Sequence, residues 1–305
     1  GGGGPSIPVF NDILENEKRK CKKEEQNQEP IITEEDLKPN NPETFDEPKP
    51  LTQQFKDYWY AGEAEISSYD LEQYRYGEKR TGSAVLIYVT EPFLKNKQVK
   101  SNKSNPENIP VLKLNSTKNF LTGIYPYSIM QSVFYPVGNN SFALKATASV
   151  QEWCGQTYTQ LNNRKQFEVM SHSYFEGEAD QKFTLEKTVL ENELWAQLRI
   201  DPKSLPTGSF ELIPSLEYLN LYHKPLQAYK ATAELKNNSY SITYLEINRK
   251  LTINFSENFP NIIESWEEVV DNKTSTGKLK TTIKSNYWNK NSNNDLHFRE
   301  ILQLQ

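Results

Sequence analysis

Apolar and polar residues alternate along much of this chain, in short runs separated by turn-forming residues. The alternation begins at residues 58–66 and returns at 152–161, whereas residues 82–93 form a more continuous apolar run. A period of two places successive side chains on opposite faces, so these segments are predicted to be β-strands, with 82–93 near the centre of a sheet. Further strands are predicted at 111–115, 141–150, 165–176, 183–189, 208–219, 228–235, 239–247, 249–255, 261–270, 277–285 and near 297–304. The aromatic segment 120–138 is interrupted by Pro126 and Pro136, as edge strands and turns tend to be.

Helical periodicity is confined to one segment, residues 191–206, where Pro202 and Pro206 keep the predicted helix short. Asn237-Asn238 and Gly277 fall where hairpin turns are expected. Strands do not alternate with helices along the chain, which argues against a doubly wound nucleotide-binding fold. The predicted fold class is all-β: a large, curved antiparallel sheet or two abutting sheets over residues 51–305, with a subdivision near residue 164 left open.

The N-terminal fifty residues have a different composition. Residues 21–50 begin with Cys21 and contain nine acidic residues, four lysines and five prolines. Such a segment has too few apolar residues to form a core, so it is predicted to be a disordered tether, with a lipid attached to Cys21. Residues 1–20 lack the apolar run of a signal peptide, and Lys18, Arg19 and Lys20 precede the cysteine; we expect a non-native leader there.

Charge narrows the classes of partner. The net charge of −5 resides entirely in residues 21–50, so the body from residue 51 onward is neutral. A neutral body argues against nucleic acid as a partner, because that recognition needs a basic surface. No run of residues reaches the length of about 20 that an apolar membrane helix needs.

No group of residues forms a recognisable catalytic or metal-binding motif. Cys154 would need a histidine base, and no cysteine-protease context is present, so we expect a buried, inert thiol. Ser171, His172 and Ser173 are adjacent on a predicted strand, where neighbours point to opposite faces; His172 is predicted to face solvent. The other histidines are scattered, so neither a metal nor a cofactor is expected.

Two other features carry functional hypotheses. Glu63 and Glu65 would share one strand face, as the paired carboxylates of a hydrolase do. Aromatic residues concentrate in the first half of the chain, and an exposed subset would form a docking or sugar-stacking face, because Tyr, Trp and Arg are enriched at interfaces. The predicted partner-binding residues are Trp59, Tyr60, Arg75, Tyr125 and Tyr127.

Three segments carry a resemblance to a known family: FKDYWYAGEAEISSYDLEQYRYGEKRTGSAVLIYVTE, PVLKLNSTKNFLTGIYPYSIM and QEWCGQTYTQLN. They resemble a family of envelope lipoproteins from Bacteroidota, and the similarity extends over residues 51–305. Some members carry the label "septum formation inhibitor Maf", yet the SxSPRR-like motif of genuine Maf pyrophosphatases is missing from this sequence. CKKEE at Cys21 is similar to the acidic export signals of surface lipoproteins. The resemblance implies a location in the envelope and supplies no catalytic residues.

Three functions follow as hypotheses. The first is a non-enzymatic outer-membrane or surface lipoprotein, anchored through Cys21, that binds an envelope protein. The second is a carrier that holds a lipid or other apolar ligand inside a half-barrel. The third is an envelope hydrolase that uses Glu63 or Glu65. An exposed aromatic face would favour the first function. A dry apolar cavity would favour the second, and converging carboxylates the third.

Overall fold

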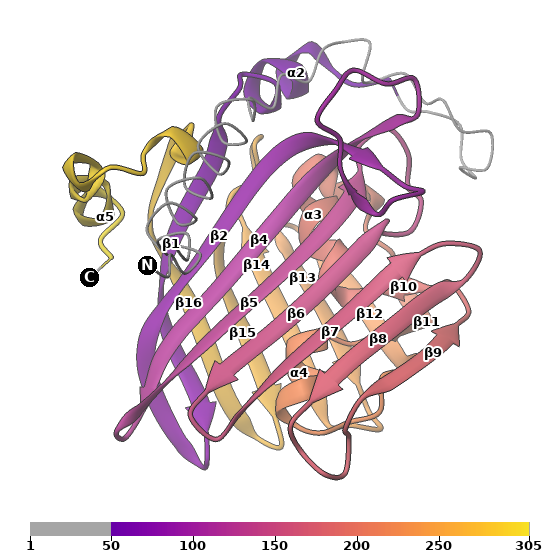
Figure 1. Cartoon of the computed structure of the whole chain (residues 1–305), viewed down its shortest axis with the longest axis vertical. Coiled ribbons are helices and arrows are strands. Elements are labelled where there is room, and N and C mark those ends of the chain that lie inside the picture. The colour runs from indigo at the N-terminus through magenta and orange to yellow at the C-terminus, as the bar shows by residue number, and fades with distance from the viewer. Residues whose placement is uncertain (1–49, 305) are drawn as a thin grey trace, which may run out of the picture.

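A computed structural model describes residues 50–304, and the predicted leader, Cys21 and almost all of the tether lie outside this range. One open, curved sheet dominates the described chain (Figure 1), which confirms the all-β prediction. Its sixteen strands are β1 Ala64–Arg75, β2 Glu78–Leu94, β3 Val99–Lys100, β4 Asn108–Thr122, β5 Tyr125–Pro136, β6 Lys145–Glu152, β7 Gly155–Asn163, β8 Phe167–Ser173, β9 Gln181–Leu185, β10 Val189–Leu190, β11 Gly208–Ile213, β12 Tyr229–Lys236, β13 Ser239–Tyr244, β14 Arg249–Phe255, β15 Ile263–Val270 and β16 Lys273–Ser285.

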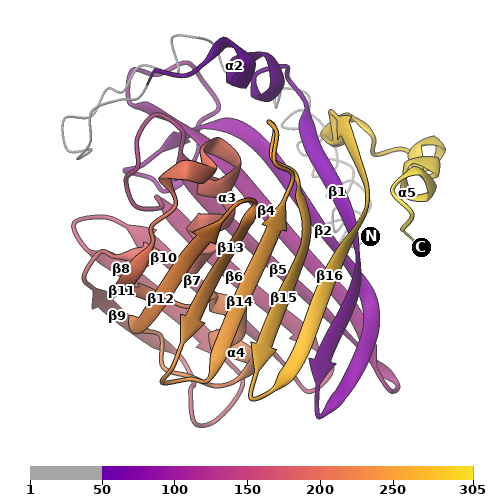
Figure 2. The same cartoon turned by 180° about the vertical axis from the view of Figure 1, so that it is seen from behind.

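The sheet bends back on itself to form two facing layers (Figures 1 and 2). Strand order runs β10 to β16 in sequence, then β1, β2 and β4 to β9, with β3 added to β2. The pairing of β16 with β1 therefore joins the two layers along one side, while β9 and β10 are the unpaired ends on the other. All strand pairs are antiparallel except β10 with β11. Arg164 lies in the turn between the paired strands β7 and β8, so one sheet includes residues on both sides of 164.

Short helices fill and cover the sheet. They are α2 Gln53–Trp59, α3 Glu191–Ile200, α4 Leu216–Leu221 and α5 His297–Ile301, with single 3₁₀ turns at η2 Pro202–Ser204, η3 Tyr287–Asn289 and η4 Asn293–Asp295. The helix α3 packs on β4 and β5, and α4 packs on β5 and β6, so both lie between the layers. None of the helices in residues 50–304 has the length and apolar character needed to span a bilayer.

The largest hydrophobic core lies between the two layers and around α3 and α4. It is rich in fully buried aromatic side chains, among them Trp59, Tyr69, Tyr88 and Phe167. A small second core lies on the outer face of β1 and β2, where the C-terminal segment packs Leu302 against Ile66 and Val89. Cover on both faces explains why β1 is buried continuously from Ala64 to Tyr69 instead of alternating.

Several predicted element boundaries were wrong. The segment predicted as a strand near 297–304 contains helix α5, and the end of the predicted strand 208–219 contains the start of α4. Asn237-Asn238 does form a hairpin turn, but Gly277 lies inside β16. A Cβ on Gly277 would lie 2.2 Å from Cζ2 of the Trp266 ring, so this glycine lets the indole rest on the strand backbone and is not a turn residue.

A buried carboxyl at the start of α3 gives the fold a pH dependence. Burial raises the pKa of Glu193 to about 8, although the backbone N–H groups of Leu190 and Ala143 donate to Oε1, at 2.8 and 3.4 Å. In the unfolded chain a glutamate titrates near pH ~4.3. The raised pKa therefore contributes stability that is complete below ~4.3 and is lost as the pH rises towards 8.

We expect Glu193→Gln to abolish this loss of folding stability at high pH, because glutamine does not ionise. The variant should match the native protein near pH 4 and exceed it by a few kcal/mol at pH 8, since each pKa unit is worth ~1.4 kcal/mol. Urea unfolding at several pH values measures the difference, with the exposed Glu186→Gln as control. Parallel pH profiles for the native protein and Glu193→Gln would contradict the prediction.

Candidate functional site

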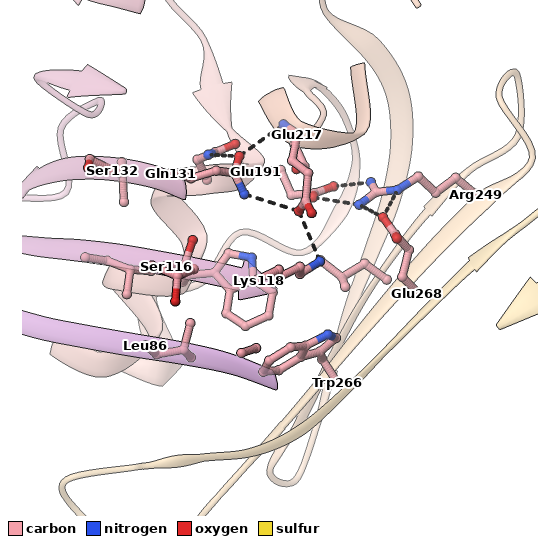
Figure 3. Close-up of a pocket in the computed structure, with 18 residues that line it drawn as sticks. Leu86, Ser116, Lys118, Gln131, Ser132, Glu191, Glu217, Arg249, Trp266 and Glu268 are labelled. Atoms are coloured by element: carbon pink, nitrogen blue, oxygen red, sulfur yellow. Dashed lines mark hydrogen bonds and ion pairs between the residues drawn. The ribbon is translucent and has the colours of Figure 1, made fainter. Parts of the chain in front are cut away.

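The interior contains a cluster of five charged side chains, which we call the interior polar cluster (Figure 3). Its members are Lys118 of β4, Glu191 of α3, Glu217 of α4, Arg249 of β14 and Glu268 of β15. Alternation along each strand turns Lys118, Arg249 and Glu268 inward with apolar neighbours such as Leu114, Leu251 and Trp266. The cluster therefore connects both layers of the sheet with both interior helices.

Arg249 is the hub of the cluster. Its guanidinium donates to both Glu191 oxygens, at 2.5 and 2.9 Å, and its Nε donates to Glu268 Oε2 at 2.9 Å. Burial alone would raise the pKa of Glu268, but the charges of Arg249 and Lys118 outweigh burial and lower it. Arg249 is thus held by two carboxylates from different elements, the bidentate geometry in which arginine pairs most strongly.

Glu217 is less completely satisfied than its neighbours. Its Oε2 accepts from Lys118 Nζ at 3.0 Å and from Gln131 Nε2 at 3.4 Å, but its buried Oε1 has no partner among the described residues. Burial raises the pKa of Glu217, and Lys118 only partly opposes this effect. The cavity beside these groups has a volume of about 60 Å³.

That volume limits what the interior can hold. Ligand pockets usually measure about 300–1,000 Å³, and a water needs at least ~10–15 Å³, so this space fits a few waters and not an acyl chain. The side chains that line the cavity are also largely charged or polar. The geometry of the interior polar cluster therefore does not favour the carrier hypothesis.

The hydrolase candidates occupy different environments. Glu65 lies on β1, fully buried, and pairs with Arg199 of α3 through two hydrogen bonds of 2.6 Å; Tyr58 also donates to it. Burial would raise the pKa of Glu65, but Arg199 lowers it below its ordinary value. Glu63 precedes the strand and is half-buried. Since both oxygens of Glu65 are already bound, the arrangement offers no free carboxylate at this position.

The structure places the five predicted partner-binding residues in two groups. Trp59 and Tyr60 lie at the end of α2. Arg75, Tyr125 and Tyr127 lie together, because Arg75 Nε donates to Tyr127 Oη at 3.2 Å and the Tyr125 and Tyr127 ring centres are 6.1 Å apart. Trp59 and Tyr127 are buried, so the prediction that they contact a partner was wrong: Trp59 is 1% exposed and packs on Tyr88, and Tyr127 stacks on Phe120. Tyr60 and Arg75 are half-buried. The Arg75 guanidinium lies 4.6 Å from the centre of the Tyr76 ring, within the range of a cation–π contact. Tyr125 is half-exposed and lies beside Trp153.

Two other sequence predictions have clear outcomes. His172 faces solvent, as expected, and its Nδ1 lies 3.1 Å from Asp180 Oδ1. The expectation that Cys154 is buried was wrong, because Trp153 and Cys154 are the two residues of the tight turn between β6 and β7 and cannot reach the core. Within residues 50–304, no three His, Cys, Asp or Glu side chains converge into a group that could hold a metal ion.

Exposed apolar side chains gather at one end of the sheet, which we call the hairpin end. An antiparallel sheet brings alternate turns to the same edge, and these turns lie at the bottom of Figure 1. Seven of the thirteen exposed large hydrophobic residues in the described chain occupy them. They are Tyr76 of the β1–β2 turn, Leu121 and Ile124 at the β4–β5 turn, Trp153 of the β6–β7 turn, Tyr174 and Phe175 of the β8–β9 loop, and Leu245 of the β13–β14 turn.

Sequence reasoning missed most of these residues, although a signal was present. Ile124 follows Gly123 in a two-residue turn and is 82% exposed, and Trp153 precedes Cys154-Gly155 and is 68% exposed. A large apolar residue at a turn position points away from any core, so its presence there signals a role other than packing.

Comparison with known proteins gives no functional assignment. No family model matches the chain, and no curated protein matches it. The similar solved structures include a β-barrel-like protein of a domain of unknown function, DUF1849, from Brucella abortus. It is 8% identical, with a TM-score of 0.43, and the match covers 72% of this chain and 97% of that one.

Proposed function

We propose that this chain is a non-enzymatic binding protein of the cell envelope, held at the outer membrane by a lipid on Cys21 and docked onto an envelope protein through its hairpin end. The observation that carries the proposal is the gathering of exposed apolar side chains in the turns of one end. Soluble monomers rarely expose large contiguous apolar patches, and such patches mark interaction sites. Tyr and Trp, both present here, are enriched at protein interfaces.

The position of the hairpin end supports a protein partner in preference to the bilayer that holds the anchor. The described chain begins at residue 50 next to α2, at the top of Figure 1, while the hairpin end lies at the bottom. A tether attached beside α2 would therefore leave the hairpin end pointing away from its own anchor. A protein projecting from the envelope fits that orientation.

The test replaces two hairpin-end residues that contribute little to the core. Leu121→Asp together with Ile124→Asp should abolish docking, because two carboxylates would have to be buried in the interface, and should leave the unfolding transition nearly unchanged. A photo-crosslinking residue introduced at Tyr76, an exposed residue of the same hairpin end, would capture the partner in intact envelopes.

Val99→Asp is the matched control, since Val99 is an exposed apolar residue of the β3 hairpin at the other end of the sheet. We expect one crosslinked protein in the native background and in Val99→Asp, and its loss in the Leu121/Ile124 variant. Equal crosslinking in all three proteins would contradict docking through the hairpin end.

A further inference from the structure

A shallow groove crosses the outer face of β6, β7 and β8 next to the hairpin end. Its volume is about 740 Å³, within the range of about 300–1,000 Å³ typical of ligand sites. Three aromatic residues line it: Trp153, Tyr158 and Tyr174. We propose that this groove binds a neutral oligosaccharide, a function that goes beyond docking onto a protein. The groove shares Trp153 and Tyr174 with the hairpin end but does not include Leu121 or Ile124.

Each aromatic ring of the groove is held in place by a contact of its own. The Trp153 ring stacks on Tyr125, with centroids 6.3 Å apart and planes 28° apart, so one face is supported and the residue remains exposed. Tyr174 rests on the β6–β7 hairpin: a Cβ on Gly155 would lie only 3.3 Å from its Cβ and Cδ1. Rings fixed before the ligand arrives lose little conformational entropy on binding.

Tyr158 of β7 provides the third aromatic ring on which a sugar could stack, on the outer face of the strand. Its hydroxyl donates to Gln160 Oε1 at 3.0 Å, and its neighbours across the strands are Ser149 and His172. The exposed rings therefore extend from the turn onto the strand face. A series of platforms along an open groove suits a linear chain of rings better than a single compact molecule.

Neutral hydrogen-bonding groups lie between the platforms. Gln151 and Gln156 face each other across β6 and β7, both are exposed, and neither side chain hydrogen-bonds within the described part of the chain. Each amide can donate and accept, as sugar hydroxyls require. The lining also contains His172 and Asp180, whose Nδ1 and Oδ1 atoms lie 3.1 Å apart.

This combination favours a saccharide over other ligands. A sugar ring has C–H faces that stack on aromatic rings, whose faces carry negative charge density, and hydroxyls at its edge that match amide side chains. A nucleic acid or polyanion would require a basic lining. A peptide added as a strand would require a free edge, yet β7 is paired on both sides.

The test uses the full chain and an array of neutral, linear tetra- to hexasaccharides of α- and β-linked hexoses and N-acetylhexosamines, followed by calorimetric titration with the best probe. Trp153→Ala and Tyr174→Ala should each weaken binding about tenfold, since one lost stacking contact is worth up to ~1.5 kcal/mol. Tyr174→Phe should bind like the native protein, because it retains the ring. Because these side chains are exposed, the unfolding transition should not move.

The Leu121/Ile124 variant separates this proposal from the proposed docking function. It should bind the saccharide like the native protein, so loss of docking and loss of sugar binding are independent results. The inference is overturned if no neutral oligosaccharide binds at millimolar concentration, if only charged glycans or peptides bind, or if Trp153→Ala and Tyr174→Ala both retain native affinity.

Discussion

Arg249→Met should lower the free energy of unfolding by at least about 3–5 kcal/mol at pH 7, the typical cost of removing one partner of a buried ion pair. Arg249 binds two carboxylates, Glu191 of the interior helix α3 and Glu268 of the adjacent strand β15. Its loss leaves both buried without the guanidinium. Since domains are stable by only about 5–15 kcal/mol, the variant would retain a small margin or unfold.

The pH dependence of the defect identifies its cause. In the native protein Glu268 has a lowered pKa, so its contribution to stability is present above the unfolded pKa and is lost as the pH falls through the folded one. Without Arg249 only Lys118 still opposes the effect of burial on the Glu268 pKa, and a protonated carboxyl costs less to bury. The difference in unfolding free energy between Arg249→Met and the native protein should therefore become smaller from pH 7 towards pH 4.

Urea unfolding of Arg249→Met, Arg249→Lys and Lys250→Met provides the measurement. Arg249→Lys should show most of the loss in unfolding free energy expected for Arg249→Met. An ammonium keeps the positive charge but cannot form the two parallel hydrogen bonds to Glu191. The exposed neighbour Lys250 serves as the control for a lost positive charge. A loss below about 1 kcal/mol in Arg249→Met would show that the cluster does not hold the layers together.

The strands could be predicted from the sequence because their signal is local. Alternation over a few residues records which face of a strand is buried, and β12, β13 and β14 were placed within a few residues. The helix α4 could not be predicted in the same way. Its six residues are too few for helical periodicity, and its start depends on Ser215 Oγ accepting from Tyr218 N at 3.3 Å.

The candidate site was harder to predict because it depends on contacts between distant segments. Glu65 and Arg199 are 134 positions apart, and nothing local marks either as half of a buried pair. Trp59 was a predicted partner-binding residue because Tyr, Trp and Arg are enriched at interfaces, but α2 turns it onto the core. Trp153 was expected on a strand, and a shift of the turn by two residues exposed it.

A second prediction concerns the other buried ion pair, Glu65–Arg199, in which the guanidinium lies against aromatic rings. The Arg199 guanidinium lies 4.7 Å from the centre of the Tyr88 ring and 5.2 Å from that of Trp59, and its Nε donates to Pro260 O at 3.0 Å. Arg199→Met alone should cost about 3–5 kcal/mol, since the Glu65 carboxylate would stay buried without its partner.

The double variant Glu65→Leu/Arg199→Met should recover that loss and match or exceed the native protein, because a packed apolar pair avoids the cost of desolvating two charges. Urea unfolding of the native protein, both single variants and the double variant completes a thermodynamic cycle, with the exposed Lys203→Met as control. The equivalent replacement of Glu191 and Arg249 should not recover, because Glu268 and the polar cavity would remain. If the Glu65/Arg199 double variant is as unstable as Arg199→Met, the pair is instead required for the fit of α3 against β1.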